Sequence, residues 1–285
     1  GLTASITPKA ITVSGLSATN IVYNGSSVDS LSGTASLTNG ATSATDNKYY
    51  TGDTVTLIGT PTAAFADANV GTGKAVTISG YTLSNANYKF VQPGLTANIT
   101  PKALTITGLT VLDKTYDQTT SATISSMGSL SGVISGDLVT LSSGLSAAFS
   151  SANVSLSGGV VQAQSIVLSG LALTGSAASN YTITTPTVSA KINPKVLTVS
   201  GVTVADKTYD GTTTATIAGG TLVGALGSDS ITLTQAGTYS SANAGSGISI
   251  TMNDSVSGTG VSTNYTLTQP TVTGTINKAP LGITV

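Results

Sequence analysis

The run Ile99-Thr100-Pro101-Lys102-Ala103-Leu104-Thr105-Ile106 decides how this chain is organised, because nearly the same run occurs at two other places. Those copies begin at Ile6 and Ile192, and a fainter copy begins at Ile276. The four copies are therefore 93, 93 and 84 residues apart. Such regular spacing over domain-sized intervals is typical of tandem repeats. The sequence predicts an array of similar units and not one large domain.

The spacing also sets the predicted boundaries. Three repeats are expected, at residues 8–100, 101–193 and 194–278. Residues 1–7 copy the end of the first repeat, so we interpret them as the last strand of a preceding repeat. Residues 279–285 resemble a first strand and are interpreted as the start of a following repeat. A unit of about 90 residues is large enough to bury its own core.

The composition lacks most side chains that carry transferable catalytic chemistry. The chain has no Cys, His or Trp, all 10 cationic residues are Lys, and all 11 anionic residues are Asp. There is no imidazole base, no thiolate nucleophile and no guanidinium clamp for phosphate. We therefore expect neither enzyme activity nor a cofactor.

Charge and hydropathy argue against two classes of partner. The formal net charge is only −1, which provides no field to attract nucleic acid. Apolar residues never run uninterrupted for the roughly eighteen positions that a spanning helix needs, so no membrane insertion of this segment is expected.

The residue types predict an all-β fold. Thr, Val, Ile and Tyr recur, and apolar residues alternate in stretches such as 230–234 and 247–252. Glycine-rich breaks between the stretches supply turns. We predict a tandem array of three immunoglobulin-like β-sandwich repeats that forms an elongated rod.

The predicted joints between repeats are short. Each consists of a proline, which fixes its own φ and restricts the residue before it, followed by a lysine that we interpret as solvated. These features predict stiff connections. The joint residues are Pro8, Lys9, Pro101, Lys102, Pro194 and Lys195.

A tyrosine turn comes early in each repeat. Asn-Gly and Asp-Gly suit turns that need positive φ, and the tyrosine can bury its ring while its hydroxyl reaches a backbone group. The three turns are Tyr23-Asn24-Gly25, Tyr116-Asp117-Gln118 and Tyr209-Asp210-Gly211.

The acidic residues allow two chemical alternatives. A calcium site would use Asp113 with Asp117, or Asp206 with Asp210, but the first repeat has no Asp at either position. A Lys–Asn amide crosslink would need a buried Asp beside a desolvated Lys and an Asn. Its candidates are the joint lysines with Asp53, Asp137 or Asp229, otherwise interpreted as turn residues, and Asn87, Asn180 or Asn264.

A further recurring element places an aromatic residue four positions before an Asn, at Phe65 and Asn69, Phe149 and Asn153, and Tyr239 and Asn243. We interpret it as a loop anchored by a buried ring, with the Asn forming local hydrogen bonds.

The third repeat, with Lys207-Thr208-Tyr209-Asp210-Gly211-Thr212, Ser241-Ala242-Asn243 and Asn264-Tyr265-Thr266-Leu267, resembles the Tyr-Asp-Gly (YDG) repeats of very large bacterial surface proteins. The first repeat is similar to the related mostly-β glycine-rich (MBG) repeats. Asn24 and Gln118 depart from the Tyr-Asp-Gly pattern. Such repeats form stalks in filamentous-haemagglutinin-like adhesins.

The resemblance implies a structural stalk that is extracellular, at the bacterial cell surface or secreted, and that projects a distal adhesive domain for cell-surface, host or biofilm-matrix attachment. The expected partners are neighbouring repeats. The absence of cysteine agrees with export as an unfolded chain. The alternative is a repeated weak glycan- or matrix-polysaccharide-binding module, with Tyr49, Tyr50 and Tyr81 as exposed rings, or lateral self-association through edge strands.

Overall fold

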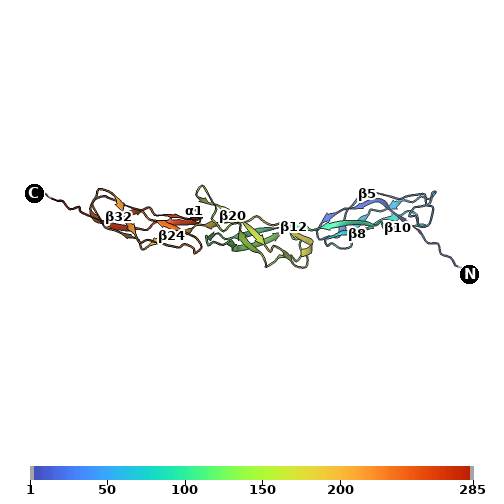
Figure 1. The fold of residues 1–285 in the computed structure, drawn as a ribbon. Coiled ribbons are helices and arrows are strands. Elements are labelled where there is room, and N and C mark those ends of the chain that lie inside the picture. Colours follow the sequence, from blue (N-terminus) through green and yellow to red (C-terminus); the bar gives the residue numbers. More distant parts are fainter. Residues whose placement is uncertain (1–2, 283–285) are drawn as a thin grey trace. The chain divides into compact units, whose positions relative to one another are not determined.

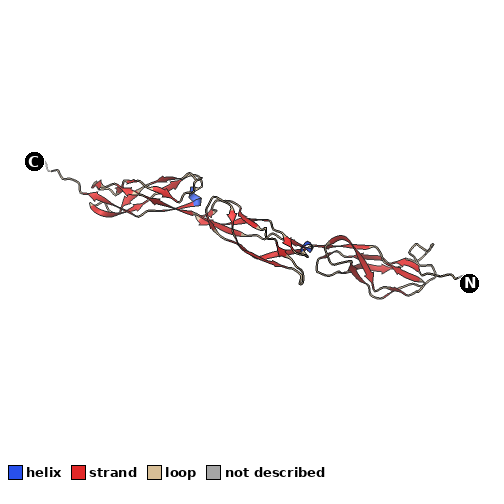
Figure 2. Ribbon diagram, turned by 90° about the horizontal axis from the view of Figure 1, so that it is seen from below, coloured by secondary structure: helices blue, strands red, loops and turns tan. Residues whose placement is uncertain are grey.

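The computed structural model describes residues 3–282, and strands make up nearly all of its regular structure (Figures 1 and 2). Within that range the helices are a four-residue α-helix, α1 (Val261–Asn264), and a three-residue 3-10 helix, η1 (Ala178–Asn180). The prediction of an all-β chain is confirmed. None of the described helices is long and apolar enough to cross a membrane.

The strands of the first predicted repeat are β1 (Lys9–Thr12), β2 (Ser14–Ala18), β3 (Ile21–Val22), β4 (Val28–Asp29), β5 (Leu31–Ser36), β6 (Leu57–Ile58), β7 (Thr62–Phe65), β8 (Gly71–Ser79), β9 (Thr82–Leu83), β10 (Tyr88–Val91) and β11 (Leu95–Thr100).

The strands of the second are β12 (Lys102–Val111), β13 (Lys114–Thr115), β14 (Ser121–Ala122), β15 (Ile124–Ser131), β16 (Thr140–Leu141), β17 (Ser146–Phe149), β18 (Leu156–Ser157), β19 (Val160–Val161), β20 (Ala163–Ser169), β21 (Leu173–Thr174), β22 (Tyr181–Ile183) and β23 (Ser189–Asn193).

The strands of the third are β24 (Lys195–Ser200), β25 (Thr203–Val204), β26 (Lys207–Thr208), β27 (Thr214–Ala215), β28 (Ile217–Ala218), β29 (Thr221–Val223), β30 (Thr232–Thr234), β31 (Gly237–Tyr239), β32 (Gly245–Met252), β33 (Ser255–Ser257), β34 (Tyr265–Thr268) and β35 (Val272–Asn277).

Every repeat contains the same parallel strand pair near its beginning. The lysine of the proline-lysine joint lies opposite a tyrosine: Lys9 opposite Tyr88, Lys102 opposite Tyr181, and Lys195 opposite Tyr265. The pairs are β1–β10, β12–β22 and β24–β34. The strand that opens each repeat is thus joined to a strand that lies much later in the same repeat.

Every repeat also contains a five-stranded sheet, in the orders β3-β11-β8-β7-β4, β13-β23-β20-β17-β14 and β26-β35-β32-β31-β27. Its first two strands are parallel in each case, and the register recurs. Ile21 pairs with Ile99, Lys114 with Ile192, and Lys207 with Ile276. The sequence repeats therefore correspond to repeats of topology.

The two compact units of the chain divide it differently from the sequence repeats. The first unit contains residues up to Thr107 together with 129–144 and 171–185, and the second contains 108–128, 145–170 and everything from Pro186 on. The parallel pair of the second repeat belongs to the first unit, whereas its five-stranded sheet belongs to the second.

The apolar cores explain this division. One core, in the first unit, combines Tyr23, Phe65 and Ile99 of the first repeat with Leu104 and Tyr181 of the second. Another, in the second unit, combines residues of the second and third repeats in the same manner; it contains Tyr116, Phe149, Val154, Ile166, Ala190, Ile192, Leu197, Val261 and Tyr265. Apolar burial therefore continues from one repeat into the next, and residues on both sides of each joint belong to one core.

The predicted terminal strands form no strand pairing where they are described. Residues 3–7 form no regular secondary structure, and Ile6 is 99% exposed, whereas its counterpart Ile99 in β11 is 1% exposed. Residues 279–282 form no strand, and residues 1–2 and 283–285 lie outside the described part of the chain.

Candidate functional site

The joints between repeats are the candidate functional site, because the recurring motifs meet there. A single proline separates the last strand of one repeat from the first strand of the next: Pro101 lies between β11 and β12, and Pro194 lies between β23 and β24. Proline fixes φ at the one residue that separates the two strands.

The three tyrosine turns have the same backbone placement. The amides of Tyr23, Tyr116 and Tyr209 each donate a 2.8 Å hydrogen bond to the last strand of the same repeat, at Thr100, Asn193 and Asn277. In the second and third repeats the following Asp accepts a hydrogen bond from the amide two residues later, and Asn24 accepts the same bond in the first. These are Asx turns.

The third position of the turn needs the left-handed conformation. Its φ is 76° at Gly25, 68° at Gln118 and 77° at Gly211. Glycine adopts this conformation without strain, whereas Gln118 is one of two described non-glycine residues with positive φ. The glycine of the Tyr-Asp-Gly pattern therefore meets the backbone requirement of this turn.

In the first unit, the tyrosine of the first repeat is buried against the second repeat. The Tyr23 hydroxyl donates to Asp137 Oδ2 at 2.9 Å, and the Tyr181 hydroxyl donates to the same oxygen at 2.5 Å. The two rings meet edge to face with centroids 5.3 Å apart. Edge-to-face packing adds to the apolar burial. The hydroxyl thus reaches a carboxylate of the next repeat and not the backbone group that we expected.

The second unit contains the same arrangement between the second and third repeats. Tyr116 and Tyr265 donate to Asp229 Oδ2 at 3.2 and 2.6 Å, and their ring centroids are 5.4 Å apart. We call each set of two tyrosines and one aspartate a tyrosine clamp: Tyr23, Asp137 and Tyr181 in the first unit, and Tyr116, Asp229 and Tyr265 in the second.

The clamps change the acidity of their members. Burial, followed by the hydrogen bond to the carboxylate, raises the pKa of Tyr181 and of Tyr265 to about 12. Burial also raises the pKa of Tyr23 and Tyr116. The hydrogen bond from Tyr265 lowers the pKa of Asp229. Both clamps are therefore most stable with neutral tyrosines, and the second-unit clamp also favours an ionised Asp229.

A buried asparagine completes each joint. Asn180 is 3% exposed; its Oδ1 accepts from the amide of Val70 at 2.9 Å, and its Nδ2 donates to Asn69 Oδ1 at 3.1 Å. Asn264, also 3% exposed, makes the same two bonds, each 2.9 Å, to Val154 and Asn153. The aromatic–Asn loop of one repeat is therefore held by the Asn-Tyr pair of the next.

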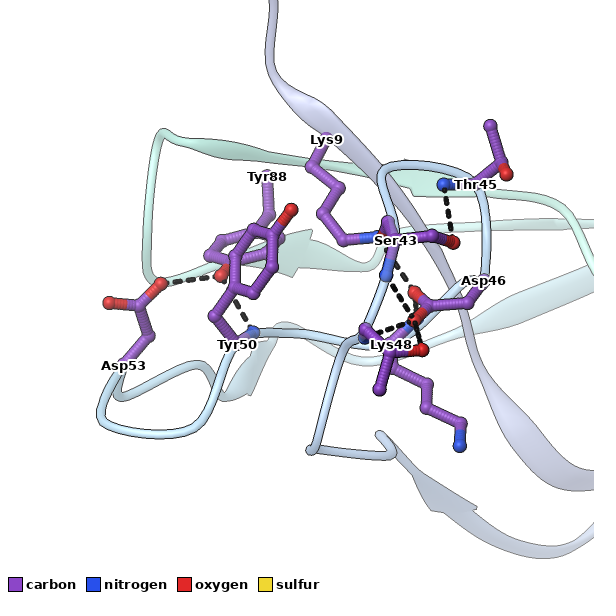
Figure 3. A network of polar contacts seen from close by, with 9 residues as sticks. Lys9, Ser43, Thr45, Asp46, Lys48, Tyr50, Asp53 and Tyr88 are labelled. Atoms are coloured by element: carbon purple, nitrogen blue, oxygen red, sulfur yellow. Dashed lines mark hydrogen bonds and ion pairs between the residues drawn. The ribbon is translucent and has the colours of Figure 1, made fainter.

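The beginning of the first repeat carries the corresponding aspartate and tyrosine, Asp53 and Tyr88 (Figure 3). Tyr88 donates to Asp53 Oδ2, and its hydroxyl accepts the amide of Tyr50 at 3.0 Å. Here Lys9 is not solvated as predicted, since its Nζ binds Ser43 O at 2.7 Å and Asp46 Oδ1 at 2.8 Å. The hydrogen bond from Lys9 holds the Asp46 pKa below its usual range.

The acidic residues of the calcium alternative have other partners. Asp117 and Asp210 form ion pairs with Lys114 and Lys207 at 2.7 and 2.8 Å. Asp113 Oδ1 accepts from the amide of Lys191. Over residues 3–282 no group of three or more His, Cys, Asp or Glu could hold a metal ion. None of these contacts involves Asp206.

Four of the crosslink candidates also make hydrogen bonds across the joints. Both ends of the Asn180 and Asn264 amides are hydrogen-bonded to the preceding repeat, and Asp137 and Asp229 accept tyrosine hydroxyls. The backbones of Asp53, Asp137 and Asp229 each close a turn onto the residue three positions earlier. Turn formation and clamp formation thus use different atoms of the same residue.

These features define the class of protein: a tandem array of all-β repeats whose apolar cores continue across the joints. The YDG domain family matches residues 7–96, 100–189 and 193–273, and the chain belongs to this family. Comparison with curated proteins and with solved structures found no match.

Sequence reasoning missed the clamps. It placed Tyr23, Asp137 and Asn180 in three separate motifs, because nothing in their spacing shows that they meet across a joint. The only signal was that all three motifs recur with the same period, which is expected if they depend on one another.

Proposed function

We propose that this chain is a structural stalk segment of a large bacterial surface or secreted adhesin. It would be extracellular and would hold a distal adhesive domain away from the cell for attachment to host or biofilm matrix. We propose further that each repeat is an immunoglobulin-like sandwich, that the array is a stiff rod, and that MBG-type repeats accompany it in its parent protein.

One observation supports this proposal above the others: consecutive repeats share a core. A proline-only connection, a tyrosine clamp and a bidentate Asn bond occur at both joints. Bending at such a joint would expose buried rings and leave a buried Asn without partners, which costs free energy. A stalk needs this resistance to bending.

Small-angle X-ray scattering of the chain tests the shape. Three repeats of about ten-residue strands predict a maximum dimension of roughly 100 Å. A compact particle would contradict the stalk. Tyr116→Ala should broaden the distance distribution by loosening one joint, and Tyr209→Ala, which alters no joint between described repeats, is the matched control.

The glycan-binding alternative has one supporting observation. Tyr50 is 45% exposed, but Tyr81 packs against Phe90 with centroids 6.4 Å apart and Tyr49 is partly buried. Repeated weak binding needs a surface on every repeat. A glycan array probed with the chain tests it, and binding that Tyr50→Ala abolishes would favour this function over the stalk.

A further inference from the structure

The second repeat, which has a described repeat on each side, divides its buried residues between two cores. Leu104 and Tyr181 belong to the core of the first unit, whereas Phe149 and Ile166 belong to that of the second. Among the described residues, neither core takes members from both parts of this repeat. We call residues 101–107, 129–144 and 171–185 its first half, and residues 108–128, 145–170 and 186–193 its second half.

The chain passes between these halves at five places, and glycine stands at four of them. The fifth is the step from Thr185 to Pro186. Glycine gives neither core a side chain, and it loses more conformational freedom on folding than any other residue. These crossings are therefore places where the repeat opens at low cost. The four glycines are Gly108, Gly128, Gly144 and Gly170.

Glycines at the same level of the first repeat are packed more closely. A Cβ added at Gly15 or Gly59 would lie 2.3 or 2.1 Å from a backbone oxygen, so backbone packs directly against backbone there. Gly108 is the counterpart of Gly15, and Gly144 lies one position from the counterpart of Gly59. A Cβ at these two residues would meet its nearest atom at 3.9 and 3.6 Å, which is ordinary contact.

A glutamine links the two halves of the first and third repeats but not those of the second. Gln92 Oε1 accepts from the Ile78 amide at 2.9 Å, and its Nε2 donates to the Ile78 carbonyl. Gln269 makes the same pair of bonds to Asp254, at 2.9 and 2.8 Å. Each glutamine precedes a proline, where the second repeat has Thr185, which lacks the carboxamide. We call this pair of bonds the glutamine brace.

We propose that the second repeat is not one cooperative unit. Its first half unfolds together with the first repeat, its second half unfolds together with the third repeat, and the division lies at the glycine crossings. Residues that share a buried core lose their contacts together, whereas halves with separate cores and no brace have little that couples them. The units of unfolding are therefore centred on the joints and displaced by half a repeat from the family repeats.

The experiment measures hydrogen exchange by mass spectrometry on the full chain with two substitutions, each outside the second repeat. Phe65→Ala removes a buried ring from the core of the first unit, and Leu197→Ala removes a buried side chain from that of the second. Phe65→Ala should speed exchange in residues 102–107 and β22 by on the order of a hundredfold and leave β17 and β20 unchanged. Leu197→Ala should do the reverse.

Two outcomes would overturn the proposal: equal acceleration in both halves of the second repeat, or acceleration confined to the repeat that carries the substitution. Phe65→Leu is a milder second variant and should give the same pattern if Phe65→Ala fails to fold.

The brace is tested by adding it. With Thr185→Gln in the Phe65→Ala chain, the acceleration should extend into β20, so that the difference between the halves falls by about tenfold. An unchanged difference would refute the role given to the brace. Because exchange reports which residues open together and not the overall dimension, this inference and the proposed stalk can fail separately.

Discussion

Tyr116 and Tyr209 have the same turn, the same 2.8 Å backbone bond and the same Lys–Asp pair three residues apart, but one is 5% exposed and the other 46%. Tyr116 has Asp229 and Tyr265 of a following repeat beside it; Tyr209 has no described repeat after it. The comparison shows that the motif fixes the backbone, while a neighbouring repeat decides whether the ring is buried.

The largest expected effect is truncation of the buried ring. Tyr116→Ala should destabilise the chain by about 3–5 kcal/mol, because it removes a large aromatic side chain from a core and leaves a cavity. Tyr209→Ala, as the control, should change stability by no more than about 0.5 kcal/mol. Urea denaturation followed by circular dichroism measures both. Similar losses for the two variants would contradict the comparison.

The buried asparagine gives the next effect. Asn264→Ala should cost about 1–3 kcal/mol, since it leaves the buried amide of Val154 without its partner and removes the bond to the exposed side chain of Asn153. Asn87→Ala removes the exposed counterpart in the first repeat and should be close to neutral. Thermal unfolding by calorimetry distinguishes them. A neutral Asn264→Ala would show that water replaces the lost bonds.

The clamps also predict loss of stability in alkali. The pKa of Tyr265 is raised to about 12 from an ordinary value of about 10. Unfolded tyrosine releases its proton first, so this contribution is complete below pH 10 and is lost as the pH rises toward 12. Stability measured from pH 9 to 12, with tyrosinate absorbance at 295 nm as the probe of ionisation, should show this decline.

Removal of the hydroxyl supplies the control for the pH dependence. Tyr265→Phe should weaken the decline between pH 10 and 12, and Tyr209→Phe should leave it as in the unmodified chain. A decline that is unchanged in Tyr265→Phe would assign it to groups outside the clamp.

The smallest effect concerns the turn itself. Gln118→Gly should stabilise the chain by about 0.5–1 kcal/mol, because glycine relieves the left-handed strain at φ 68° while losing more backbone entropy on folding. Gly211→Gln, the reverse change at the turn of the third repeat, should destabilise by a similar amount. If Gln118→Gly destabilises instead, the glutamine side chain contributes to the joint.

Much of the fold could be predicted from particular residues. Alternating apolar residues and β-branched composition indicated strands, and the spacing of the Ile-Thr-Pro-Lys runs indicated three repeats, both of which the structure and the family match confirm. The prediction that the joint lysines are solvated was wrong for Lys9, because a loop of the first repeat places Asp46 beside it.

By itself, the sequence determined everything that depends on short-range chemistry: the strands, the turn at each Tyr-Asp-Gly position and the proline at each joint. Only the tertiary structure decided which motifs meet, because Tyr23 and Asp137 are 114 residues apart in the chain and contact through side chains whose spacing encodes no pairing. Local patterns are set by φ, ψ and alternation, whereas a clamp forms only when two repeats bury their surfaces against each other.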